Sequence, residues 1–120
     1  NWASGWARAI GVDRANDTVI RHNWVFRNYG EGIGIRSCLR GAITGNWVYD
    51  NFSVNIYLDN AAGTSASPLP VEENAVFQTG NQDYWRDYGA LDGNFEPGDG
   101  ILFGNEVGAP VQMLMDWIKA

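Results

Sequence analysis

A repeat of 23 residues constrains what this chain can fold into more than any other feature of its sequence. The segment NWVFRN (residues 23–28) returns as NWVYDN (residues 46–51). A β-rich run follows each copy, GIGI (residues 32–35) in the first and NIYL (residues 55–58) in the second. A fixed period in the twenties is typical of architectures that stack one structural unit on the next.

Weaker copies extend the pattern in both directions. Ile10 and Val12 match the first two apolar positions of the GIGI run at the same shift of 23. Residues 74–77 (NAVF) match residues 46–49 at a shift of 28, and residues 101–103 match residues 56–58 at a shift of 45. The pattern therefore occurs about four times, with extra residues inserted into the last coil.

Alternating apolar residues and Gly/Asn turns predict three short strands in each 23-residue turn. In the clearest turn these strands cover approximately residues 18–21, 24–27 and 32–36. Helical spacing is absent until about Val111, so the chain is predicted to be all-β. Residues 108–120 fit either a short helix or the start of another coil.

The motif Asn23-x-Val25-x-x-Asn28 with Gly32-Ile33-x-Ile35, and its copy one turn later, resemble the right-handed parallel β-helix proteins of the pectate-lyase-like group. The resemblance covers about residues 1–106. It implies an all-β right-handed parallel β-helix solenoid of about four coils. We expect residues 1–120 to be a single segment of a longer solenoid, with neighbouring coils of the parent chain as partners.

In such a stack, residues one turn apart become neighbours, because coils lie at the ordinary strand spacing of about 4.8 Å. Asparagines at one bend would form a hydrogen-bonded ladder of amides, and asparagine tolerates the unusual backbone angles of a bend. The predicted columns are Ile10, Ile33, Ile56 and Ile101; Val12, Ile35, Leu58 and Phe103; Val25, Val48 and Val76; and Asn23, Asn46 and Asn74.

The charged residues check this register independently, because they were not used to choose the shift. Every pair that a shift of 23 brings together in the first coils is opposite in sign, and like charges one strand apart would destabilise the stack. The pairs are Arg8 with Glu31, Asp13 with Arg36, Arg36 with Asp59, Asp17 with Arg40, and Arg27 with Asp50. Exposed pairs are worth only about 0.2–1 kcal/mol each, so their main role is to set the register.

Two insertions interrupt the last coil. The first, about residues 61–70, is rich in small residues and proline and is predicted to be a surface loop. The second, about residues 80–100, combines acids with aromatics, and a long loop on a rigid scaffold is a common place for function. Aromatic faces beside carboxylates suit a sugar ring, although the same rings could pack against the scaffold. The predicted sugar-binding residues are Tyr57, Asp83, Tyr84, Trp85, Asp87 and Tyr88.

The resemblance also implies chemistry on acidic polysaccharides in a groove beside one parallel sheet. Lyases and epimerases need a cation or an arginine to neutralise a uronate carboxylate, and a base to take the adjacent proton. The column Asp13–Arg36–Asp59 is the candidate catalytic group, and Ca²⁺ is a possible cofactor. A hydrolase would instead pair Asp59 with Asp83 or Asp87. The same column is also explained as salt bridges that set the register.

Composition narrows the remaining classes of function. The net charge is −6 and the arginines are scattered, which argues against a nucleic-acid binder. No apolar run is long enough to span a membrane, and Cys38 is the only cysteine, so no internal disulfide forms. The primary hypothesis is an extracellular or cell-surface protein that acts on carbohydrate, as a lyase, epimerase or hydrolase if it is an enzyme. The alternative is a non-catalytic surface scaffold or adhesin.

Overall fold

The computed structural model describes residues 7–59, 69–79 and 99–104. Every regular element in these residues is a β-strand. The strands are β1 (Arg8–Asp13), β2 (Thr18–Arg21), β3 (Trp24–Phe26), β4 (Glu31–Arg36), β5 (Gly41–Thr44), β6 (Trp47–Tyr49), β7 (Val54–Asp59), β8 (Val71–Glu72), β9 (Ala75–Phe77) and β10 (Asp99–Gly104). The predicted strands at 18–21, 24–27 and 32–36 correspond to β2, β3 and β4, with end points within one residue.

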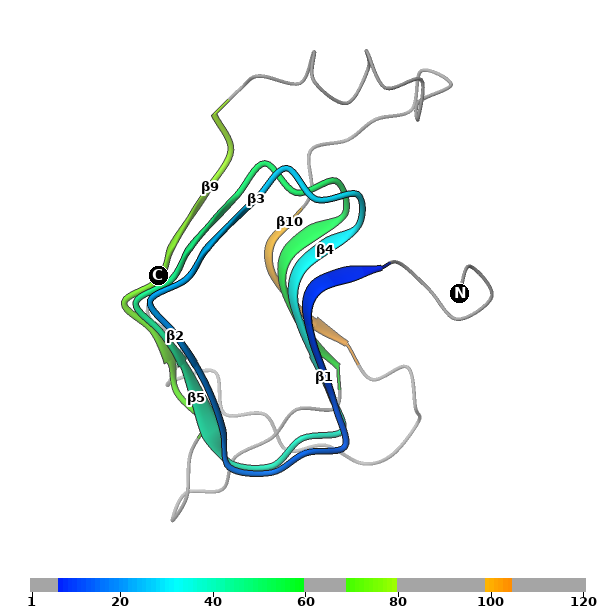
Figure 1. The fold of residues 1–120 in the computed structure, drawn as a ribbon, viewed down its shortest axis with the longest axis vertical. Helices are drawn as coiled ribbons and strands as arrows, with labels where there is room; N and C mark the ends of the chain where they lie inside the picture. The colour runs from blue at the N-terminus through cyan, green and yellow to red at the C-terminus, as the bar shows by residue number, and fades with distance from the viewer. Residues whose placement is uncertain (1–6, 60–68, 80–98, 105–120) are drawn as a thin grey trace.

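The strands form three parallel sheets, and every third strand along the chain belongs to the same sheet. The orders are β1-β4-β7-β10, β2-β5-β8 and β3-β6-β9, and all described pairings are parallel. We call each set of three consecutive strands a coil, so β1–β3 form the first coil and β4–β6 the second. Figure 1 looks along the stack, and the strands of successive coils overlie one another there. The prediction of an all-β chain with parallel sheets is confirmed.

The strand register is the one that the repeat predicts. Ile10 pairs with Ile33, Ile33 with Ile56, and Ile56 with Ile101. Val25 pairs with Val48, which pairs with Val76. The shifts of 23, 28 and 45 residues are therefore all real register relationships.

The apolar columns point inward and form the core. Ile33, Val48 and Ile56 are each 0% exposed. The third coil completes a further column with Val71, which pairs with Ile43, and Leu69 from the end of the first predicted insertion also packs into the core. Full burial of one such side chain contributes about 1.5–3 kcal/mol, so these columns are the main source of stability.

An asparagine ladder runs through all three coils at the corner before β3, β6 and β9. The backbone N–H and the Nδ2 of Asn23 both donate to Oδ1 of Asn46 at 3.0 Å. Asn46 donates in the same way to Oδ1 of Asn74 at 2.9 Å. The predicted ladder is confirmed.

The expectation that these asparagines adopt the unusual backbone angles is wrong. The positive φ angles belong to the preceding residues, His22 (57°), Gly45 (66°) and Glu73 (58°). A left-handed residue turns the chain sharply, and the asparagine that follows can then start a strand with its amide directed along the stack. The bend and the ladder therefore depend on two adjacent residues.

A second asparagine ladder occupies the corner after β3 and β6. It is not continued by an asparagine at the equivalent position of the third coil. Nδ2 of Asn28 donates to Oδ1 of Asn51 at 2.8 Å. In the third coil Thr79 takes the equivalent position by register. Nδ2 of Asn51 donates instead to Oδ1 of Asn55 at 2.8 Å. Asn55, in β7 at the start of the third coil, thus supplies the acceptor that the missing asparagine would have supplied.

Candidate functional site

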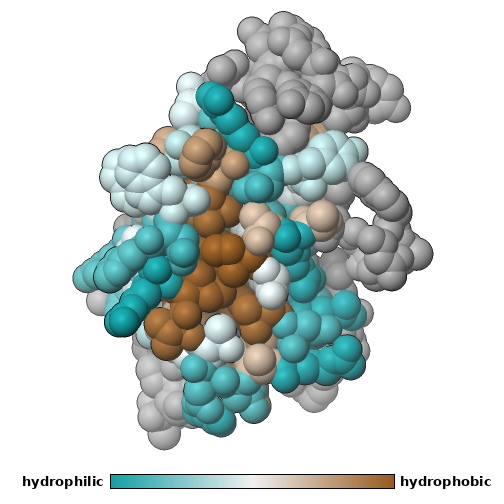
Figure 2. All heavy atoms as spheres, viewed as in Figure 1, coloured by the Kyte–Doolittle hydropathy of each residue, from teal (hydrophilic) through white to brown (hydrophobic). Residues whose placement is uncertain are grey.

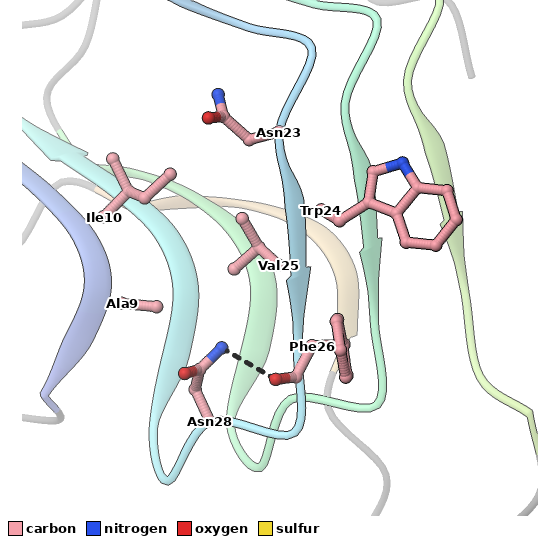
Figure 3. Close-up of a pocket in the computed structure, with 7 residues that line it drawn as sticks. All are labelled: Ala9, Ile10, Asn23, Trp24, Val25, Phe26 and Asn28. Carbon is pink, nitrogen blue, oxygen red and sulfur yellow. Dashed lines mark hydrogen bonds between the residues drawn. The ribbon is translucent and has the colours of Figure 1, made fainter.

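The outer side of the sheet β3-β6-β9 carries an unusual concentration of aromatic rings. Each strand has three residues with an inward valine at its centre, so the flanking residues face outward. Figure 3 shows Trp24 and Phe26 on the opposite side of β3 from Val25 and Ile10. We call this surface the aromatic face and define it by Trp24, Phe26, Trp47, Tyr49 and Phe77.

The rings of the aromatic face form two columns that follow the strand register. Trp24 stacks on Trp47, with ring centroids 5.4 Å apart and planes 16° from parallel. In the second column Tyr49 stacks between Phe26 (5.1 Å) and Phe77 (4.7 Å). Trp47 also meets Phe77 edge to face at 6.1 Å, which joins the columns. Such pairs contribute about 0.5–1.5 kcal/mol each beyond their burial, so the rings hold one another in place.

Stacking does not remove these rings from solvent. Trp24 is 68% exposed and Trp47 is 48% exposed, and Phe26 and Phe77 are also exposed. A further stacked pair, Tyr29 with Phe52, lies at the corner after β3 and β6. Large exposed apolar surfaces often mark binding sites, so the aromatic face is the candidate binding surface.

Sequence reasoning missed the aromatic face. The repeat at residues 23–25 and 46–48 predicts the strand register, but the spacing alone assigns no role to its tryptophan rings. The signal was present in the alternation within each three-residue strand, which places valine inward and aromatics outward in WVF (24–26) and WVY (47–49). AVF (75–77) keeps the valine and one ring.

The structure brings the predicted catalytic residues into one column. Asp13 pairs by register with Arg36, which pairs with Asp59. Nε of Arg36 lies 3.4 Å from Oδ2 of Asp59, and Asp59 is 0% exposed. The carboxylate of Asp13 lies 3.2 Å from Nη2 of Arg14. A carboxylate with no exposed surface cannot reach a polymer outside the stack, so the geometry of Asp59 favours a structural role.

The same column does not fit a calcium site. Calcium prefers several converging oxygen ligands, and here an arginine side chain stands between the two aspartates in the register. Within residues 7–59, 69–79 and 99–104, no three His, Cys, Asp or Glu side chains gather as a metal site. Calcium remains a prediction for the parts of the chain outside these ranges.

Other charged pairs lie where the repeat predicted them. Nε of Arg8 lies 2.8 Å from Oε2 of Glu31. Arg40 donates two hydrogen bonds to the carboxylate of Asp17, at 2.8 and 3.0 Å. The hydrogen bond from Arg40 lowers the pKa of Asp17 below its ordinary value. Both contacts match the register, although Glu31 is buried and Asp17 is exposed, and this agrees with a role in fixing it.

Most of the predicted sugar-binding residues lie outside the described residues, namely Asp83, Tyr84, Trp85, Asp87 and Tyr88. The alternatives for residues 108–120 also lie outside them. Tyr57 is described and is 6% exposed, so its ring offers little surface to a ligand in this structure. The described residues contain no helix long and apolar enough to span a membrane.

No protein-family model matches this chain, and no curated protein or solved structure matches it at a significant level. The similarity to parallel β-helix proteins therefore rests on the sequence motifs and on the parallel, coil-by-coil register.

The Arg36–Asp59 contact gives a first testable prediction. We expect Arg36→Met to lower the free energy of unfolding by about 1–3 kcal/mol, because it removes the cation beside a buried carboxylate while Arg36 itself is partly exposed. The control is Arg14→Met, whose side chain is 81% exposed, and it should cost less than about 0.5 kcal/mol. Urea denaturation measures both values. Equal effects would show that burial of Asp59 does not depend on Arg36.

Proposed function

We propose that the chain is a segment of a right-handed parallel β-helix, pectate-lyase-like in architecture, that binds polysaccharide through the aromatic face. The observation that carries the proposal is the pair of exposed, mutually stacked ring columns on the sheet β3-β6-β9. The proposal includes an extracellular or cell-surface location, where structural polysaccharides are found.

The chemistry of the rings supports a sugar ligand. A pyranose ring has an apolar C–H side that packs on aromatic surface, and hydroxyl groups that stay hydrated at its edge. The rings repeat along the stack, so consecutive sugars of one polymer would meet equivalent contacts. They are also held in place by their neighbours, which reduces the entropy lost on binding. Single-stranded nucleic acid also stacks on aromatic rows, but it needs a positively charged groove, and this chain has a net charge of −6.

The described residues support binding of a polysaccharide without its cleavage. The buried, arginine-paired carboxylate of Asp59 is poorly placed for a lyase or hydrolase acting on an external polymer. The alternative is a non-catalytic surface scaffold or adhesin, in which the aromatic columns only strengthen stacking. This alternative is favoured by the Trp24–Trp47 and Phe26–Tyr49 stacks themselves, because they stabilise coil–coil contacts with or without a ligand.

The test is binding of the chain to immobilised pectate, alginate and neutral glycans, with and without Ca²⁺. We expect the double variant Trp24→Ala/Trp47→Ala to bind about 30-fold more weakly than the parent, at about 1 kcal/mol for each ring removed. The control variant is Val19→Ala, which removes an exposed apolar side chain (56% exposed) from the neighbouring strand β2 and should bind normally. Ultraviolet absorbance for unsaturated products, recorded in parallel, detects lyase activity.

The outcomes separate the hypotheses. If no polymer is bound under any condition, the polysaccharide proposal fails and the scaffold alternative stands. If binding occurs but the double variant keeps it, the ligand uses another surface. Circular dichroism of each variant confirms that the loss of rings has not unfolded the stack.

A further inference from the structure

We infer that the N-terminal end of the stack, formed by β1, β2 and β3, is a docking face for another coil of the same asparagine-bearing repeat, laid parallel to the first. This inference concerns what covers one end of the stack, so it goes beyond polysaccharide binding and does not depend on it.

This end of the stack is apolar at its centre. β1, β2 and β3 stand at one end of their respective sheets, with β4, β5 and β6 as their neighbours among the described strands. Figure 2 views this end and shows a continuous hydrophobic area inside a rim of hydrophilic side chains. Ile10 and Val12 are only half-buried, whereas Ile33 directly behind Ile10 is 0% exposed. The face therefore exposes core positions that a further coil would cover.

A hollow of about 220 Å³ lies across this end. Figure 3 shows its lining, with Ile10 of β1 facing Val25 of β3 across the interior and Asn23 and Asn28 at the two corners. The hollow therefore combines an apolar floor with an amide at each end of β3. The second coil presents the same pair of amides, Asn46 and Asn51, to the first coil.

The direction of the hydrogen bonds specifies the chemistry of the occupant. In both ladders the Oδ1 of one coil accepts the backbone N–H and the Nδ2 of the asparagine one coil closer to the N-terminus. Within the part of the chain that the structure describes, no group donates to Oδ1 of Asn23 or of Asn28. The docking face thus presents two carbonyl acceptors, five residues apart in the sequence. An occupant with asparagines at the same spacing would supply both pairs of donors.

The charged residues of the first coil indicate which charges the docked coil should carry. Arg8 contacts Glu31 of the second coil, and Asp17 contacts Arg40 of the second coil. An occupant that continues this alternation places an acid over Arg8 and bases over Asp13 and Asp17. Residues 31–53 carry that pattern as Glu31, Arg36 and Arg40, together with the two asparagines Asn46 and Asn51.

The described residues favour a further coil over head-to-tail docking of a second copy. At the opposite end, the sheet β1-β4-β7-β10 reaches one strand further than the other two sheets. The described strands at the two ends are therefore not flush, because β10 has no described counterpart in the sheets that contain β2 and β3.

The experiment adds such a coil to the full chain. A second copy of residues 31–53 is inserted between Ala7 and Arg8, which is a 23-residue insertion in register. We expect the melting temperature to rise by about 5 °C or more, because stacked repeats gain a full interface with each added coil. The first control carries alanine at the inserted equivalents of Asn46 and Asn51. The second control inserts a copy of residues 8–30, which has the same length but places like charges over Arg8, Asp13 and Asp17.

Both controls are expected to melt lower than the complementary insertion. If the complementary insertion melts no higher than the alanine control, or unfolds the chain, this end does not accept a coil and the inference is overturned. Sedimentation of the unmodified chain provides an independent arm. Concentration-dependent dimers that the insertion abolishes would identify a second copy as the occupant and would overturn the inference as well.

Discussion

Replacing Asn46 with alanine should destabilise the fold by about 3–5 kcal/mol, because it removes the centre of a fully buried hydrogen-bond network. Asn46 is 0% exposed. Its Oδ1 accepts two hydrogen bonds from Asn23, and its Nδ2 donates to the carbonyl of Ile20 and to Oδ1 of Asn74. Alanine leaves the backbone N–H of Asn23 and the carbonyl of Ile20 without these partners, and burying such groups unpaired is more costly than losing an exposed hydrogen bond.

The matched control is Asn23→Ala, in the same column but at the end of the stack. Asn23 is only half-buried, and it donates to Asn46 without a described donor to its own Oδ1. We expect this change to cost about 1 kcal/mol, the typical net value of a hydrogen bond. Urea denaturation followed by circular dichroism measures both variants. If the two changes cost the same, the ladder does not gain strength from burial.

Gly41→Ala should be strongly destabilising for a single methyl addition, with an expected loss of more than about 4 kcal/mol. Gly41 has a φ of 115°, where an L-residue is strained. A Cβ at this position would also collide with the backbone carbonyl oxygen of Thr18 in the preceding coil. That oxygen belongs to a paired strand, so it cannot move without opening the contact between β2 and β5.

The control is Gly11→Ala, which adds the same methyl group to β1. A Cβ on Gly11 would meet only the flexible side chain of Arg8, at 3.3 Å. We expect this variant to fold with a stability within about 1 kcal/mol of the parent. Thermal melts and the soluble yield compare the two. A Gly41→Ala protein that melts close to Gly11→Ala would show that the coils at this corner are further apart than described.

The strand register could be predicted well from the sequence, because in a stacked architecture residues one repeat apart are in contact. Ile33 and Ile56 recur at a fixed shift because they touch, so finding the shift is equivalent to finding the strand register. The backbone at the corners was not predictable in the same way. The ladder reveals which side chains meet, but nothing in it indicates that His22 or Glu73, rather than the asparagine after it, takes the left-handed angle.

The candidate site was predicted less well, and the reason is physical. A repeat reveals which residues are neighbours along the stack but not how much solvent reaches them. Asp13 and Asp59 occupy one column, yet Asp13 is exposed and Asp59 is fully buried. Conversely, Trp24 and Trp47 recur as regularly as core residues, and only their outward direction identifies them as surface.

The construction of the aromatic face has a consequence for how such a protein would evolve. Each coil contributes one or two rings, placed by the same backbone positions that set its strand register. Duplication of one 23-residue unit within a gene would therefore lengthen the aromatic face and the supporting core in a single event. The length of the aromatic face would then be set by the number of copies, and it would change by gain or loss of whole units more readily than by reshaping loops.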